Sequence, residues 1–188
     1  MHAWEVVSLD SDPSGCPTIC ADILTFDYTK LGGTFDFIWA SPPCVFYSIA
    51  RSNAKTPRDL EGADRLVARA LEVIDHFKPR YYCIENPQSG LLKTREIVSH
   101  LPYKDVDYCS YGTPFRKRTR LWTNLPFTPA PSCKQDCAAC VGGRHVAWSQ
   151  KASKNQRGGA GFTTAELGRI PRLLVEDIYS CIVEGLKT

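Results

Sequence analysis

The chain has 188 residues, of which 43% are hydrophobic and 23% are charged, and its formal net charge is +3. These values are typical of one globular domain with a buried core, and the mild positive charge permits a polyanionic partner. No run of about 18 apolar residues is present, which excludes a membrane-spanning helix, and the first residues do not form a secretory signal.

The nine cysteines of the chain are many for its length, and their number is odd. A domain of this size does not need a disulfide scaffold. We therefore expect an intracellular, reducing compartment, the cytoplasm or the nucleus, where thiols serve catalysis, metal binding or core packing.

The first third of the chain contains three predicted strands, at 4–10, 18–26 and 35–40. All three are rich in β-branched or aromatic residues. Asp10 ends the first strand, and Asp22 lies near the end of the second.

The middle of the chain begins with a predicted helix at 57–79, where apolar residues recur at helical spacing until Pro79 ends the pattern. The elements predicted after it are a strand at 80–86, a short helix at 91–101, a hairpin-like pair of strands at 104–112 and 118–125, and a final helix at 170–186. Alternating strands and helices predict an α/β fold with a mainly parallel, doubly wound sheet, whose site lies at the carboxyl ends of the strands.

The composition changes after Phe127, and 128–162 is poor in aliphatic residues and rich in Gly, Ser, Lys and Cys. We interpret this segment as a small loop-rich insertion, called the insertion below. It would separate two parts of one catalytic domain, 1–127 and 163–188.

Cys44 stands at a predicted strand end, in the sequence "SPPC". Two prolines fix the backbone there and would present a thiol rigidly beyond the strand. A thiolate is a strong nucleophile, so Cys44 is a candidate catalytic residue. The alternative is a packed cysteine in a proline-rich turn.

Two further stretches carry charged residues that suit catalysis. Glu85 follows the buried run "YYCI" in "CIENP", where burial favours the protonated carboxyl group; alternatively, it is an ordinary acid at a strand end. The segment "YGTPFRKRTRLW" (111–122) places Arg118 and Arg120 on one face of a strand and Lys117 on the other. Arginines suit phosphate and carbonyl oxygens, but they also occur on a solvated edge strand.

Taken in order, "SPPC", "ENP" and "YGTPFRKRTRLW" resemble the signature of the C5-cytosine DNA methyltransferase family, in particular its compact viral and phage-type members. The resemblance implies a Rossmann-like sheet and transfer of a methyl group from S-adenosylmethionine to C5 of a cytosine in double-stranded DNA. It also adds a virus-infected cell to the expected locations.

The resemblance assigns a role to each catalytic candidate. Cys44 would attack C6 of a flipped cytosine and form a covalent adduct, while Glu85 would bind N3 and the exocyclic amine. Arg118 would contact the O2 side of the base, and Arg120 would support the catalytic loop. The residues after Cys44, 45–58, would form a mobile loop that closes over it. Three polar residues of this loop would meet phosphates: Ser48, Arg51 and Lys55.

The resemblance also assigns a cofactor site. Asp10 would accept hydrogen bonds from the ribose hydroxyl groups, and Asp22 would bind the adenine amine. The other residues expected around the adenosine are Ser11, Ile23, Pro42 and Pro43.

The chain departs from the family pattern at its N-terminus. The family's first strand and its Phe-x-Gly-x-Gly turn have no counterpart here, so we expect an N-terminally truncated sheet and half a cofactor pocket. Another segment or another chain would have to supply the missing strand. Phe115 is a smaller departure, because many members carry glutamine at that position.

The insertion contains "CKQDCAACVGGRH", and three thiols and one imidazole suit tetrahedral zinc. The predicted ligands are Cys133, Cys137, Cys140 and His145. A cysteine-rich loop with free thiols is the alternative. The insertion stands where the family has its target-recognition segment, and its basic residues would contact DNA or form a solvated loop: Arg144, Lys151 and Lys154.

Two other functions remain open from the sequence. The same chemistry would methylate cytosine in RNA, as one branch of the family does with tRNA. A catalytically inactive, methyltransferase-like protein that binds nucleic acid is the second alternative, which the missing turn favours and the intact Cys44 and Glu85 oppose.

Overall fold

The computed structural model describes residues 4–49, 51, 54–147 and 162–187. Its helices and strands in chain order, with short 3-10 helices marked η, are β1 (Leu9–Asp10), η1 (Pro13–Gly15), β2 (Ile19–Cys20), η2 (Tyr28–Lys30), β3 (Phe37–Ala40), α1 (Leu60–Phe77), β4 (Tyr81–Pro87), η4 (Leu91–Thr94), α2 (Glu96–Ser99), β5 (Tyr103–Asp107), η5 (Tyr108–Tyr111), β6 (Arg118–Thr123), β7 (Cys140–Val141), β8 (Arg144–His145), α3 (Thr164–Gly168) and α4 (Arg172–Leu186).

A four-stranded sheet in the order β3-β4-β6-β5 forms the centre of the protein. β3 and β4 are parallel, whereas β6 runs antiparallel to both of its neighbours, β4 and β5. The α/β class and the hairpin-like pairing of the last two strands are therefore confirmed. The sheet is mixed rather than mainly parallel, because β6 returns directly from β5 without a crossover helix.

The two strands predicted first are much shorter than the sequence suggested. β1 and β2 have two residues each and pair only with each other, in parallel, with Leu9 opposite Ile19. Residues 4–8 are exposed and lie outside any strand. A strand persists only where its N–H and C=O groups find a neighbour, and in the described part of the chain these segments meet for two residue pairs.

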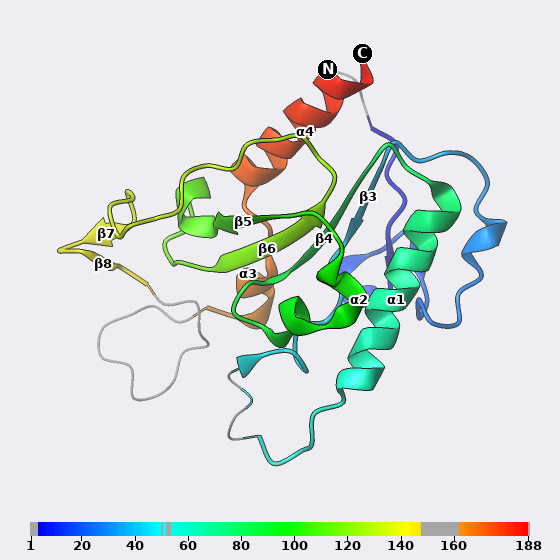
Figure 1. Cartoon of the computed structure of the whole chain (residues 1–188), viewed down its shortest axis with the longest axis horizontal. Coiled ribbons are helices and arrows are strands. Elements are labelled where there is room, and N and C mark those ends of the chain that lie inside the picture. The colour runs from blue at the N-terminus through cyan, green and yellow to red at the C-terminus, as the bar shows by residue number, and fades with distance from the viewer. Residues whose placement is uncertain (1–3, 50, 52–53, 148–161, 188) are drawn as a thin grey trace.

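Helices cover both faces of the central sheet (Figure 1). Successive side chains of a strand point to opposite faces, so Cys83 and Leu121 pack toward α4, and Ile84 and Trp122 pack toward α1. All four side chains are buried. The result is a three-layer arrangement with one apolar cluster on each side of the sheet.

Helix α1 has a well-defined start and end. The side chain of Asp59 accepts a hydrogen bond from the N–H of Gly62 at 2.7 Å, which satisfies one of the free donors of the first turn. Lys78 adopts a left-handed conformation directly before Pro79 and ends the helix. The predicted helix at 57–79 is thus confirmed. Among the described residues, no helix is both long and apolar enough to cross a membrane.

We expect the substitution Leu121→Ala to lower the free energy of unfolding by about 2–5 kcal/mol. Leu121 lies on the central strand β6 and is fully buried, so its loss leaves a cavity beneath α4. Chemical denaturation of both proteins measures the difference. Val141→Ala is the matched control, because that side chain is 72% exposed and its loss should change little. Equal stabilities of Leu121→Ala and the parent chain would contradict this packing.

Candidate active site

A pocket of about 950 Å³ lies between the short β1–β2 pair and the edge strand β3. Side chains of α1 and α4 complete its wall, among them Ala70 and Ile178. All six residues predicted to hold the cofactor line it: Asp10, Ser11, Asp22, Ile23, Pro42 and Pro43. The structure therefore brings together segments that are more than thirty residues apart in the sequence.

Two carboxylates enter this pocket from the ends of β1 and β2. Asp10 accepts a hydrogen bond from the N–H of Asp12, and Asp22 accepts one from the N–H of Leu24, both at 2.9 Å. These local turns fix the orientation of the carboxylates while both residues stay exposed. Together with the apolar lining, the two carboxylates give the pocket acceptors for the hydrogen-bond donors of a bound ligand.

Arg69 of α1 holds the segment that carries Asp22, a role that the sequence did not reveal. Its guanidinium group donates to the carbonyl oxygens of Ile23 and Phe26 at 3.1 and 2.9 Å and stacks on the ring of Tyr28. Local sequence cannot reveal this role, because the partners of Arg69 lie more than 40 residues earlier in the chain.

Cys44 is exposed just beyond the end of β3. The side chain of Asn86, at the end of β4, donates to the carbonyl oxygen of Pro42 at 2.9 Å. Asn86 is itself 1% exposed, so this bond is shielded from water. It fixes the Pro-Pro turn, and with it the position of the thiol, to the neighbouring parallel strand.

The segment after Cys44 is anchored near its start by Tyr47. This side chain is fully buried and donates a hydrogen bond to Asp64 of α1 at 2.8 Å, while Arg95 forms an ion pair with the same carboxylate. Arg58 donates to the carbonyl oxygens of Phe46 and Ser48, both at 2.8 Å. The start of the predicted mobile loop is therefore tied to the body of the protein.

Glu85 is 6% exposed and lies at the end of β4. Its carboxylate accepts a hydrogen bond from the hydroxyl of Tyr108 at 3.0 Å and pairs with the ammonium group of Lys117 at 3.4 Å. Lys117 also lies over the ring of Tyr108. The sequence predicted neither Tyr108 nor Lys117 as a site residue, although it placed Lys117 on the face opposite the arginines.

The charges of Lys117 and Glu85 reach the Cys44 thiol. Neighbouring atoms desolvate the sulfur, although the residue as a whole is exposed, and this desolvation raises the pKa of Cys44 above its ordinary value. The ammonium group of Lys117 lowers that pKa, and the carboxylate of Glu85 raises it. Lys117 is thus the group that favours the reactive thiolate.

Arg118 and Arg120 lie on the other face of the sheet from Glu85. Arg120 stands opposite Asn86 and Asp105, whereas Glu85 stands opposite Leu121. The guanidinium group of Arg120 forms two hydrogen bonds with Asp105, at 2.7 and 2.9 Å, and lies 3.6 Å from the ring centre of Tyr103. The structure therefore brings Lys117, rather than either arginine, beside Glu85.

Asp107 connects the basic segment to the insertion. It is 1% exposed, and it accepts hydrogen bonds from Arg116 at 3.0 and 3.1 Å and one from the N–H of Cys133 at 3.0 Å. Arg118 lies 3.6 Å away. Burial alone would raise the pKa of Asp107, but Arg116, the Cys133 amide and Arg118 lower it below the ordinary range.

The residues predicted to contact nucleic acid are only partly described. Ser48 and Arg51 follow Cys44, and Arg51 donates to the carbonyl and hydroxyl groups of Thr56. Lys55 is exposed in the same segment, and Arg144 is exposed on β8. Lys151 and Lys154 lie outside the described residues.

The predicted zinc ligands differ from the observed cluster in one residue. Ligand atoms of Cys109, Cys133, Cys137 and His145 all lie within 4.8 Å of one another. Cys140 contacts Cys137 but is not part of this group. The sequence missed Cys109 because it lies in η5, more than twenty residues before the cysteine-rich segment.

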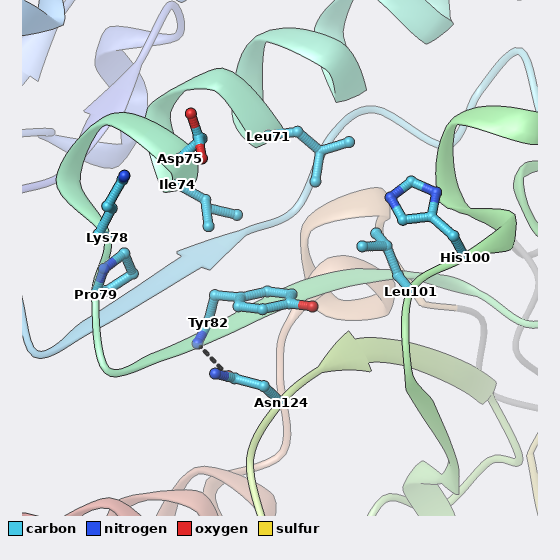
Figure 2. Close-up of a pocket in the computed structure, with 9 residues that line it drawn as sticks. All are labelled: Leu71, Ile74, Asp75, Lys78, Pro79, Tyr82, His100, Leu101 and Asn124. Carbon is cyan, nitrogen blue, oxygen red and sulfur yellow. Dashed lines mark hydrogen bonds between the residues drawn. The ribbon is translucent and has the colours of Figure 1, made fainter.

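A second hollow, of about 400 Å³, opens near the start of β4 (Figure 2). It is lined by side chains of α1, Tyr82, His100 and Asn124. Asn124 accepts a hydrogen bond from the N–H of Tyr82 and thereby fixes the first residues of the strand. No predicted site residue lines this hollow, and the candidate site lies at the other end of β4.

Comparison with known proteins agrees with this arrangement. Residues 11–101 match the family described as C-5 cytosine-specific DNA methylase. A protein of Frog virus 3 (isolate Goorha), described as a probable DNA (cytosine-5)-methyltransferase, is 33% identical over 152 residues, which cover 72% of this chain and 68% of that protein. The chain therefore belongs to the C-5 cytosine-specific DNA methylase family and has its α/β methyltransferase fold.

Two solved structures resemble the chain more distantly. One is a prophage-encoded protein of E. coli described as a DNA modification methyltransferase, with 17% identity and a TM-score of 0.40 over 56% of this chain and 32% of that one. The other is the Dnmt2 methyltransferase of S. pombe, with 17% identity and a TM-score of 0.40 over 73% of this chain and 50% of that one. The chain thus spans half or less of either protein.

We expect Asp107→Asn to lower the free energy of unfolding by about 1.5–3 kcal/mol at neutral pH, because it removes charge-assisted hydrogen bonds from a buried group. The pKa of Asp107 is lowered by folding, so its stabilisation is complete above the unfolded value of about 3.9 and disappears as the pH falls through the folded-state pKa. Denaturation of both proteins between pH 3 and 7 should show the difference shrinking only at the acid end. A difference that stays constant down to the most acidic pH would contradict this account.

Proposed function

We propose that the chain is a DNA (cytosine-5)-methyltransferase that transfers a methyl group from S-adenosylmethionine to C5 of a cytosine flipped out of duplex DNA. The observation that carries the proposal is the position of Cys44. Cys44 is an exposed residue within electrostatic reach of Lys117 and Glu85, and it directly follows two prolines that line the same pocket as Asp10 and Asp22.

The residues around the thiol divide the chemistry between them. Cys44 attacks C6 of the cytosine as a thiolate, and Lys117 favours that thiolate electrostatically. Glu85, held by Tyr108, hydrogen-bonds N3 and the exocyclic amine and thereby stabilises charge on the ring. The base has to leave the stack before any of these contacts form. Release of Cys44 after loss of the C5 proton restores the enzyme.

The pocket between β1–β2 and β3 is the proposed site of S-adenosylmethionine, which supplies the electrophilic methyl group. Asp10 binds the ribose hydroxyl groups and Asp22 the adenine amine. Ser11, Ile23, Pro42 and Pro43 enclose the adenosine. Because Pro42 and Pro43 directly precede Cys44, the same turn connects the cofactor to the nucleophile.

The basic residues outside the pocket would contact DNA. We propose that Ser48, Arg51 and Lys55 meet phosphates next to the flipped base, and that the insertion, with Arg144, reads or holds the duplex. We propose that Arg118, which lies near Asp107, contacts the O2 side of the base. Arg120, paired with Asp105, supports the catalytic loop. We propose that the chain works in a reducing compartment, including that of a virus-infected cell, where its cysteines serve as thiols.

The pocket is large for a small-ligand site. Its volume of about 950 Å³ lies at the upper end of the range for small-ligand sites, which is about 300–1,000 Å³. Within the described residues, β1 and β3 border this space without pairing with each other. We propose that a further strand, from the same or another chain, fits between these two edges and completes the methionine end of the pocket.

Covalent trapping tests the proposed nucleophile. Duplex DNA containing 5-fluorocytosine should form a denaturation-resistant complex with the chain in the presence of S-adenosylmethionine, because the fluorine prevents loss of the C5 substituent. Cys44→Ser should abolish the complex, and Cys16→Ser, an exposed cysteine elsewhere, should not. A complex that persists in Cys44→Ser would show that another residue attacks the base.

Lys117→Met should lower methyl transfer at neutral pH by roughly 3–10-fold and shift the alkaline rise of the rate to higher pH. The reason is that Lys117 lowers the pKa of Cys44, so its loss leaves a smaller thiolate fraction. Rates measured from pH 6 to 10 give the profile, and Lys187→Met is the exposed-lysine control. An unshifted profile would remove Lys117 from the mechanism.

Asp22→Asn should weaken binding of S-adenosylmethionine by roughly 10–100-fold, since it replaces a charged acceptor in the proposed adenosine site. Titration calorimetry measures the affinity, and Asp27→Asn, an acid of the neighbouring loop that does not line the pocket, is the control. Equal affinities of Asp22→Asn and the parent chain would place the cofactor elsewhere.

A further inference from the structure

Three sulfur atoms and one imidazole nitrogen converge where η5 meets the insertion. The ligand atoms of Cys109, Cys133, Cys137 and His145 all lie within 4.8 Å of one another. Nε2 of His145 is 3.5 Å from Sγ of Cys133 and 3.4 Å from Sγ of Cys137. Zinc–sulfur bonds of about 2.3 Å and zinc–nitrogen bonds of about 2.0–2.1 Å put tetrahedral sulfur and nitrogen ligands about 3.6 Å apart. The spacing fits one central ion.

The backbone of the insertion is built to bring these groups together. Gly142 and Gly143 have φ angles of 58° and 74°, which form a tight two-residue turn between β7 and β8. This turn places His145 opposite Cys140 in the hairpin register. The imidazole therefore returns to the side of Cys137, which lies three residues before Cys140.

A second turn prepares the sulfur of Cys133. Gln135 adopts a left-handed conformation, with φ 69°, and its N–H donates to Sγ of Cys133 at 3.3 Å. Such N–H donors stabilise a thiolate, which is the form that binds metal.

No disulfide bond joins the cysteines of the cluster. Cys140, which lies beside the cluster, is not bonded either, because its sulfur is 3.5 Å from that of Cys137, whereas a disulfide bond is about 2.03–2.05 Å long. Cys109 and Cys133 are only 5% and 6% exposed. Several thiols packed this closely against an imidazole repel as thiolates unless a cation lies between them.

We propose that Cys109, Cys133, Cys137 and His145 bind one zinc ion, and that this structural ion fixes the insertion to the end of β5. Three thiolates and one imidazole in a closed tetrahedral set are the ligands that zinc prefers. Cys109 belongs to the sheet-side helix η5, while the other three ligands belong to the insertion. The ion thus cross-links two parts of the chain that are far apart in sequence.

The zinc site also controls a buried charge network. The N–H of Cys133 donates to Asp107, and the same carboxylate binds Arg116 and lies beside Arg118. Removal of the ion would release Cys133 and leave Asp107 with one donor fewer. The metal is therefore a positioning element for the basic segment, rather than part of the chemistry.

Metal content and a set of cysteine variants test the proposal without relying on catalysis. Protein purified under reducing conditions should contain about one zinc per chain by elemental analysis. Cys109→Ser and His145→Ala should lose it. Cys140→Ser should keep it, since Cys140 lies outside the four-residue group, and so should Cys181→Ser on α4. Circular dichroism shows whether each variant is folded.

Cobalt substitution keeps the ligand set testable if Cys109→Ser does not fold. The cobalt form of the full chain should show the absorption of a tetrahedral site with three thiolates, and Cys140→Ser should leave that spectrum unchanged. Chelation of zinc should lower the melting temperature of the full chain. The proposal is overturned if the reduced chain takes up no zinc, if folded Cys109→Ser keeps a full equivalent, or if Cys140→Ser loses it.

Discussion

The parallel pairing of β3 with β4 is the constraint on which the candidate site depends. It brings the carboxyl ends of both strands to one edge of the sheet, and the Asn86 amide bound to the Pro42 carbonyl holds the turn beyond β3 in place. Cys44 follows that turn, and Glu85 directly precedes Asn86. Backbone pairing and one buried hydrogen bond thereby bring Cys44 and Glu85, the proposed nucleophile and acid, to the same edge of the sheet.

The electrostatics of the site follow from this framework. β6 lies between β4 and β5, and its successive side chains point to opposite faces of the sheet. Lys117 consequently pairs with Glu85, while Arg120 is bound to Asp105 on the other face. Asp107 joins this basic segment to the cysteine cluster of the insertion. Consecutive residues of the basic segment thus contact Glu85 on one side and, through Asp107, the cysteine cluster on the other.

Local sequence signals predicted much of this arrangement. The apolar spacing and Pro79 predicted α1. The ordered motifs singled out Cys44 and Glu85, and the family resemblance that they carry singled out six residues that line one pocket. Interactions across the fold were not predictable in the same way. Cys109, Lys117 and Arg69 acquire their roles from partners on other elements. The first two strands are shorter than their composition predicts, because pairing with a neighbour decides where a strand ends.

Transfer of labelled methyl from S-adenosylmethionine to nucleic acid tests the central claim most directly. Duplex DNA and tRNA would be compared as substrates, with Cys44→Ala beside the parent chain. The account predicts transfer to duplex DNA that disappears in Cys44→Ala. Transfer that survives in Cys44→Ala, transfer to tRNA alone, or no transfer by a folded chain that binds the cofactor would contradict it.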